Sequence, residues 1–317
     1  LAAHLEDAER CRALVCWNVN PAASCPEQAR LRRALAREDL FTGVCDLFAT
    51  DTADLADVVL PAASWLECND IVIPYFHRAL SAQVKAAEPL GEALPNSEIF
   101  RRMATAMGLD DAPLHEPDDE ILARVMASSG TGLDFAGLAQ RGTVWPSAQP
   151  VVAFEDRRFP TPSGRVELAS DAAQADGHGR LPRPHADPRP ERGRLRLLSP
   201  ASPWALNASF SNDPKIARRT GALELALTEA DATERGLAAG DLVRVTSPAG
   251  ELVVPVRITD ELPAGVALLP KGRWPKLEPA GANVNALTLA QPSDMGQSTT
   301  VHGLEVSVAA VRERAPA

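Results

Sequence analysis

Three short apolar segments near the N-terminus constrain the fold of this chain most. Residues 13–17 are fully apolar, and residues 42–48 and 57–60 are two further short runs rich in apolar residues. Runs of this length are typical of strands that are buried on both faces of a parallel sheet. Residues 26–35 can form a helix that Pro26 opens. The order of strand, helix and strand therefore predicts an α/β fold with a partial, doubly wound and mostly parallel sheet.

The rest of the chain changes character twice. Asn96 and Ser97 can cap a helix that ends at Gly108, and residues 159–168 indicate an ordered turn that leads into a strand. Beyond residue 193, short strands between Gly and Pro turns predict a small, mostly-β barrel. The strands expected there are 195–199, 241–246, 252–258 and 266–269, with a brief helix capped by Thr228.

This pattern predicts three parts. We expect an α/β domain over residues 1–110, a connecting segment with a Pro-rich linker over residues 111–192, and a β-barrel domain over residues 193–317. An apolar fraction of 45% is enough to fill two cores.

The charge balance argues against two classes of partner. The 317 residues include 32 Lys and Arg against 42 Asp and Glu, which gives a net charge of −10. A negative protein surface is repelled by a phosphodiester backbone and by anionic lipid. No stretch approaches the roughly 18 consecutive apolar residues of a membrane-spanning helix. We therefore expect no nucleic-acid partner and no transmembrane segment.

The cysteines and the first residues bear on the cellular compartment. All five cysteines lie in the first 68 residues of the chain and show no C-x-x-C spacing, so we expect buried thiols in a reducing compartment rather than metal ligands. The first 20 residues lack the order of a signal peptide. The thiols in a reducing compartment favour the cytoplasm. The chain begins at Leu1 rather than at a methionine, and we expect that further residues precede it. The cysteines are Cys11, Cys16, Cys25, Cys45 and Cys68.

Polar side chains lie near the carboxyl ends of two of the predicted strands, where open α/β sheets bind ligands. Asn20 lies in the loop after the first strand, and its amide can donate to and accept from a nucleotide, although Asn beside Pro also simply makes turns. Asp46 lies within the predicted strand 42–48, directly after its apolar Val-Cys run, and can accept two hydrogen bonds from the N1 and N2 groups of guanine. A helix cap or a solvated loop acid is the other interpretation of Asp46. Asp51, Asp54 and Asp57 are expected to be caps and loop charges.

Five segments carry a family resemblance. Residues 46–67 read D-L-F-A-T-D-T-A-D-L-A-D-V-V-L-P-A-A-S-W-L-E, 87–93 read A-E-P-L-G-E-A, and 161–168 read T-P-S-G-R-V-E-L. Residues 198–212 and 281–303 contain the loops L-S-P-A-S-P-W-A-L-N-A-S-F-S-N and G-A-N-V-N-A-L-T, the latter followed by D-M-G-Q-S-T-T-V-H-G. These segments resemble the third and fourth domains of molybdopterin oxidoreductases of the dimethyl-sulfoxide-reductase family. The resemblance implies that the barrel is of the double-psi type.

The resemblance also implies the site residues. It places Asn20, Asp46 and Asn96 around a guanosine, although some relatives have aspartate at the position of Asn96 and lysine at that of Cys68. A second group is implied around a pterin, with Asn285 as the residue that hydrogen-bonds pterin or phosphate. His302 lies near a lysine of several relatives, and a neutral histidine or a structural role is the alternative there. This second group is Ser199, Asn207, Asn285 and His302.

Taken together, the resemblance implies the C-terminal, cofactor-binding portion of a molybdenum-dependent oxidoreductase catalytic subunit. Its cofactor would be molybdenum bis(molybdopterin guanine dinucleotide), serving oxygen-atom or two-electron transfer. No metal ligand or catalytic residue is expected in this chain, so it should be inactive alone. An iron–sulfur cluster in a preceding N-terminal region, a small-molecule redox substrate and an electron-transfer subunit or protein are further implications.

Two other functions remain as alternatives. A stand-alone molybdopterin-dinucleotide binding module would present the cofactor without catalysis. An ordinary α/β nucleotide enzyme with an appended barrel is the other, but the sequence has neither a G-x-G-x-x-G fingerprint nor a P-loop.

Overall fold

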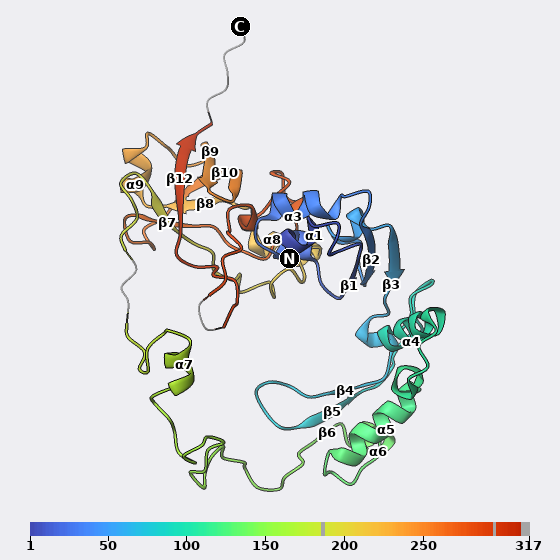
Figure 1. Ribbon diagram of the computed structural model, residues 1–317. Helices are drawn as coiled ribbons and strands as arrows, with labels where there is room; N and C mark the ends of the chain where they lie inside the picture. The colour runs from blue at the N-terminus through green and yellow to red at the C-terminus, as the bar shows by residue number, and fades with distance from the viewer. Residues whose placement is uncertain (185–187, 294–295, 312–317) are drawn as a thin grey trace. The chain divides into compact units, whose positions relative to one another are not determined.

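The chain forms two compact units in the computed structural model, which describes residues 1–184, 188–293 and 296–311 (Figure 1). Asp294 and Met295 of the last sequence motif, and part of the Pro-rich linker, lie outside the described residues. The division at residues 110 and 192 stays a prediction. Unit 1 contains Leu1–Val44, Ala49–Val58 and Ser170–Ala317, and unit 2 contains Cys45–Phe48 and Val59–Ala169.

The N-terminal strands form the predicted α/β sheet. The three strands are ordered β1-β2-β3, and two helices follow β1. Strand β2 ends at Asp46, two residues earlier than expected, and the side chains of Leu47 and Phe48 are exposed. The elements are α1 (Ala2–Leu5), β1 (Ala13–Trp17), α2 (Pro21–Ser24), α3 (Gln28–Leu35), β2 (Phe41–Asp46), η1 (Ala53–Leu55) and β3 (Val58–Pro61).

Helix α3 forms because its apolar residues recur at helical spacing. Leu31 and Leu35 are four residues apart and lie on one face, where both are buried. They pack with Leu5 and Leu40 in one apolar cluster of unit 1. The polar face carries Arg30, which pairs with Glu6 and Glu27. This packing fixes the loop between β1 and α3.

Unit 2 consists of helices and a small antiparallel sheet. Strands β4 and β5 form a long hairpin whose second strand also pairs with β6 (Figure 1). Met126 and Leu138 bury their side chains against Leu80 in the core of this unit. The elements are η2 (Trp65–Glu67), β4 (Asp70–Val72), β5 (Leu80–Gln83), α4 (Asn96–Met107), η3 (Ala112–His115), α5 (Asp118–Ser128), α6 (Phe135–Arg141) and β6 (Thr143–Val144).

Two local predictions in unit 2 were wrong. Helix α4 ends at Met107, and Gly108 after it adopts the left-handed conformation, as expected. Asn96, however, is the first residue of the helix and not its cap. Pro95 occupies the N-cap position and no side chain caps the helix, because the proline ring has no oxygen that could accept a hydrogen bond from the first turn. Residues 159–168, all of which the structure describes, form a turn closed by Gly164 N donating to Thr161 O at 3.0 Å, but no strand follows it.

The C-terminal part of unit 1 is a closed six-stranded barrel, as predicted for a double-psi type. The strand order β10-β8-β11-β7-β12-β9 combines two parallel pairs, β7 with β11 and β8 with β10, with antiparallel neighbours. Strands β8 and β12 were not predicted from the sequence. The elements are α7 (Asp171–Ala175), β7 (Leu195–Leu198), α8 (Pro214–Thr220), β8 (Leu225–Leu227), α9 (Glu229–Glu234), β9 (Leu242–Ser247), β10 (Gly250–Ile258), β11 (Val266–Leu268), η4 (Pro275–Leu277), η5 (Val284–Ala286) and β12 (Leu304–Ala310).

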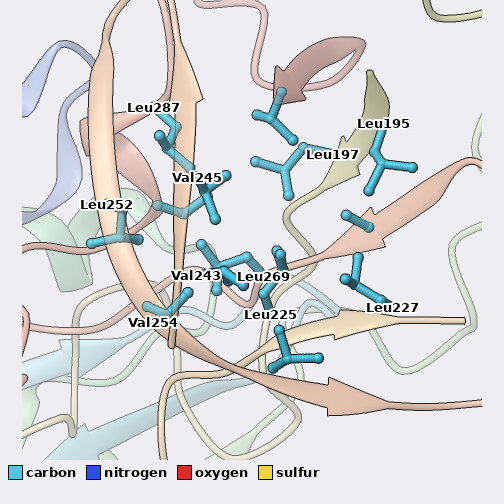
Figure 2. Packing of buried hydrophobic residues seen from close by; sticks show 14 of the residues in the cluster. Leu195, Leu197, Leu225, Leu227, Val243, Val245, Leu252, Val254, Leu269 and Leu287 are labelled. Atoms are coloured by element: carbon cyan, nitrogen blue, oxygen red, sulfur yellow. The ribbon is translucent and has the colours of Figure 1, made fainter. Parts of the chain in front are cut away.

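The barrel is filled by aliphatic side chains. Figure 2 shows Leu and Val side chains from several strands pointing toward one another in its interior. Leu225, Leu227 and Val245 are fully buried there. A filled interior leaves no room for a ligand, so any cofactor must bind to the loops outside the barrel. Among the residues that the structure describes, no helix has the length and apolarity needed to cross a bilayer.

Candidate cofactor-binding site

The structure divides the seven predicted residues between the two units. Asp46 and Asn96 belong to unit 2. The other five belong to unit 1. They are Asn20, Ser199, Asn207, Asn285 and His302.

Asp46 is a half-buried carboxylate with acceptor capacity to spare. Its Oδ1 accepts a hydrogen bond from the backbone N of Phe48 at 3.3 Å, while its backbone O accepts from Ala62 N. Burial raises the pKa of Asp46, and the amides of Phe48 and Leu47 offset part of this rise. Since an ionised carboxylate can accept about four hydrogen bonds, Asp46 can still accept from a ligand.

Asn96 carries an acceptor that the protein does not satisfy. Its Oδ1 is buried and accepts no hydrogen bond from any residue in the described part of the chain. An unpaired buried polar atom costs about 1–3 kcal/mol, so its presence calls for a partner. Cys45, beside Asp46, packs with Ile99 of the first turns of α4 in one apolar cluster. The same packing therefore positions Asp46 and Asn96 within unit 2.

Asn20 is held by the protein itself. Its side-chain Oδ1 accepts from Thr52 N at 3.2 Å and from Thr52 Oγ1 at 2.8 Å, and its Nδ2 donates to Asp51 Oδ2 at 3.2 Å. These bonds fill the oxygen of the amide and one of its two N–H groups. Asn20 can therefore offer a ligand one N–H donor and no side-chain acceptor.

Asp51 was expected to be a cap or a loop charge. The structure instead buries it in unit 1, where it joins the loop after β1 to η4 by hydrogen bonds. Its side chain is fully buried and accepts hydrogen bonds from Asn20 and from the backbone N of Lys276, the latter at 2.8 Å. The ammonium of Lys276 forms an ion pair with Asp54 at 2.9 Å. Asp57 accepts from Thr42 N at 2.7 Å. The run of aspartates thus fixes the loop after β2, and η4, by side-chain hydrogen bonds.

Asn285 lies in η5 and donates from Nδ2 to the backbone O of Ala23 at 2.8 Å. Its backbone N donates to Oδ1 of the fully buried Asn283 at 2.9 Å. Asn283 in turn exchanges hydrogen bonds with Gln28 of α3. Sequence reasoning missed Asn283 and Gln28, because nothing in a sequence marks two amides so far apart as partners.

Ser199 and Asn207 flank the loop that follows β7. Ser199 is buried, and Asn207 is exposed with a positive φ of 50°. Gly272 lies so close to this loop that a Cβ atom on it would overlap the backbone O of Asn207. Trp274 Nε1 donates to Ala208 O at 2.6 Å and anchors the same loop. The loop is therefore held against the segment that follows β11.

A pocket of about 820 Å³ lies within unit 1 beside this loop. Residues 200–205, helix α8 and Lys271 contribute to its lining, and the guanidinium of Arg219 lies 4.4 Å from the ring centroid of Trp204. The volume falls in the range of about 300–1,000 Å³ that small-molecule and cofactor sites occupy. None of the seven predicted residues lines this pocket.

His302 is exposed. Of the five cysteines, Cys16 and Cys45 are buried, and none of the five, all of which the structure describes, forms a disulfide. Burial raises the pKa of Cys45 and of Cys68, which keeps both in the neutral thiol form. No cluster of three or more His, Cys, Asp or Glu that could hold a metal ion occurs among the described residues.

These features define a class of protein: an α/β sheet and a closed β-barrel in one chain, with a cofactor-sized pocket at the loops outside the barrel. Two protein-family models match separate parts of the sequence. Residues 3–106 match the molybdopterin oxidoreductase family, and residues 195–305 match the molydopterin dinucleotide binding domain. The chain belongs to the molybdopterin oxidoreductase family, which confirms the resemblance found in its motifs.

Individual relatives agree with this assignment. The chain is similar to the probable oxidoreductase YoaE of Bacillus subtilis, with 31% identity over 309 residues, which cover 96% of this chain and 45% of that protein. It is 28% identical to the putative catalytic subunit of dimethyl sulfoxide reductase from Halobacterium salinarum, over 89% of this chain and 35% of that protein. The chain therefore spans less than half the length of these relatives.

The fold also has a counterpart of known structure. Acetylene hydratase from Pelobacter acetylenicus superimposes with a TM-score of 0.81 at 20% identity, over 97% of this chain and 46% of that protein. A likeness at this identity concerns the fold alone.

Proposed function

We propose that this chain is the C-terminal, cofactor-binding portion of the catalytic subunit of a molybdenum-dependent oxidoreductase. It contributes part of the binding site for molybdenum bis(molybdopterin guanine dinucleotide). When bound, this cofactor supplies oxygen-atom or two-electron transfer chemistry, while the protein supplies binding, orientation and electrostatics. Family membership supports the pterin cofactor, and the side chains of the site support its guanine form.

The observation that carries the guanine form is the pair of unfilled acceptors in unit 2. Asp46 has a half-buried carboxylate with spare acceptor capacity, and Asn96 has a buried Oδ1 without a donor among the described residues. The Watson–Crick edge of guanine offers N–H donors at N1 and N2, whereas that of adenine offers one amino group and an acceptor nitrogen. A base that brings two donors satisfies these acceptors better than one that brings a donor and an acceptor.

In unit 1 the proposed contacts differ in chemistry. Asn20 has one free N–H, which suits an oxygen of ribose or phosphate. Asn285 uses one N–H on Ala23 and keeps its Oδ1 and second N–H for a pterin edge or a phosphate. Ser199 and Asn207 provide hydroxyl and amide groups beside the pocket, and His302 a ring nitrogen. These neutral groups can bind a dinucleotide without a fixed positive charge.

The activity of the whole protein extends the proposal. We expect a small-molecule redox substrate and an electron-transfer partner, in keeping with the word subunit in the name of the Halobacterium salinarum relative. The metal ligand and any iron–sulfur cluster would belong to other parts of the polypeptide. Five cysteines without a disulfide suit a reducing compartment such as the cytoplasm.

The test is chemical analysis of the purified native protein. Acid hydrolysis of its cofactor should release GMP together with oxidised pterin, and elemental analysis should find molybdenum. Release of CMP in place of GMP would reject the guanine assignment and leave the pterin assignment intact. A protein that contains neither pterin nor molybdenum, when expressed in a host that makes the cofactor, would overturn the proposed function.

A further inference from the structure

Asn283 occupies the centre of a buried hydrogen-bond network in unit 1. Its side-chain N donates to the backbone O of Ala23 at 2.8 Å and to that of Arg273 at 2.6 Å. Its Oδ1 accepts from Gln28 Nε2 at 3.2 Å and from Asn285 N at 2.9 Å. Both N–H groups and both lone pairs of the amide are therefore used, and the side chain has a single orientation.

Gln28 completes the network from the side of helix α3. Its Oε1 accepts from the backbone N of Asn283 at 3.2 Å, and its Nε2 also donates to Ala22 O at 3.0 Å. Both Gln28 and Asn283 have essentially no exposed surface, and they are 255 residues apart in the chain. Because each amide fixes the other, the two cannot be reoriented independently without leaving buried polar groups unpaired.

The same network determines where Asn285 lies. Its backbone N is bound by Asn283, and its side chain shares the acceptor Ala23 O with Asn283. Helix α2 and the barrel segment around η5 thus meet at one carbonyl oxygen, that of Ala23. Only the remaining atoms of the Asn285 amide can turn toward a ligand.

We infer that Asn283, supported by Gln28, is a positioning residue that orients Asn285 toward the cofactor. This inference rests on the proposed function. Asn283 itself has no free donor or acceptor and touches no ligand, because its amide is filled by protein groups. Its effect on cofactor binding passes through Asn285. Loss of the Asn283 side chain removes the hydrogen bond to the Asn285 backbone N, so the Asn285 side chain is no longer held in its present orientation.

A double-mutant cycle on the holoprotein tests this coupling. The protein is produced in a host that makes molybdopterin guanine dinucleotide, and the half-life of that cofactor on the protein is measured by mass spectrometry during dialysis. Asn285→Ala should shorten the half-life about fivefold, as expected for one lost hydrogen bond. In an Asn283→Ala background, adding Asn285→Ala should change the half-life less than about twofold, because the contact is already lost.

The matched control is Val256→Ala, a cavity variant in the barrel core that has no polar contact with the network. It lowers the free energy of unfolding without disturbing Asn285, so the full fivefold effect of Asn285→Ala should persist in its background. Gln28→Met preserves much of the side-chain volume and leaves Asn283 in place. It replaces Asn283→Ala in the cycle if that variant does not fold, and it should also reduce the effect of Asn285→Ala.

The outcomes separate the two proposals. Full additivity of Asn285→Ala with Asn283→Ala and with Gln28→Met would overturn the positioning role while the proposed function stands. An unchanged half-life in Asn285→Ala alone would overturn it as well, since no contact would remain to be oriented. A wild-type protein without any molybdopterin guanine dinucleotide would instead reject the proposed function.

Discussion

The assignment of Asp46 to guanine makes a quantitative prediction. Asp46→Ala removes a half-buried carboxylate whose bonds to guanine N–H groups would be charge-assisted, and such bonds contribute about 1.5–3 kcal/mol. We therefore expect molybdopterin guanine dinucleotide to bind roughly 10- to 150-fold more weakly, since each 1.4 kcal/mol is a factor of about ten. The measurement is the dissociation constant of the cofactor, obtained from the amount retained by the protein at a series of cofactor concentrations.

Asp54→Ala is the matched control. Asp54 lies in the same run of aspartates, but its side chain is half exposed and forms an ion pair with Lys276. Surface ion pairs of this kind contribute about 0–1 kcal/mol, so this variant should bind the cofactor about as well as the wild type. A second comparison, Asp46→Asn, preserves the shape of the side chain and replaces one acceptor by a donor that faces the guanine N–H groups. Equal affinities for the variants at positions 46 and 54 would refute the reasoning.

Three further predictions concern pH, the barrel core and the loop before α8. Burial raises the pKa of Asp46, so lowering the pH through that pKa should protonate the carboxylate and weaken guanine dinucleotide binding in the wild type. The variant Asp46→Asn should lack this pH dependence. Titrations of cofactor retention against pH measure it. Leu225→Ala removes a fully buried side chain from the barrel and should lower the free energy of unfolding by about 2–5 kcal/mol in chemical denaturation. Gly272→Ala should lower both the melting temperature and cofactor retention, because its Cβ would overlap the Asn207 carbonyl. Gly265 has a similar positive φ but open space around it, so Gly265→Ala should lower only the melting temperature, and modestly. The prediction for this loop fails if the two glycine variants retain the cofactor equally poorly.

Much of the fold could be predicted because local sequence carries its signal. The apolar run 13–17 is strand β1 with the same bounds, and the periodic Leu residues of α3 lie on its buried face. Strands β8 and β12 were missed, although both pair with strands that the sequence did predict. The expected cap at Asn96 failed because Pro95 determines the start of α4 instead.

The site could be predicted only in part. Asp46 does end a strand, and Asn96 does begin a helix packed against that strand end, as position in an α/β sheet suggests. The hydrogen-bond partners of the asparagine side chains could not be predicted in this way. Asn20 appeared free to donate and accept, yet Thr52 and Asp51 occupy most of its hydrogen-bonding capacity.

The sequence by itself determined the class of fold and the family, because apolar periodicity and long motifs are local properties of the chain. Only the tertiary structure decided that Gln28 and Asn283 form one buried network 255 residues apart. It also left the oxygen of Asn96 unpaired among the described residues. A hydrogen bond depends on two groups lying within about 3 Å in space, and separation along the chain does not encode that distance.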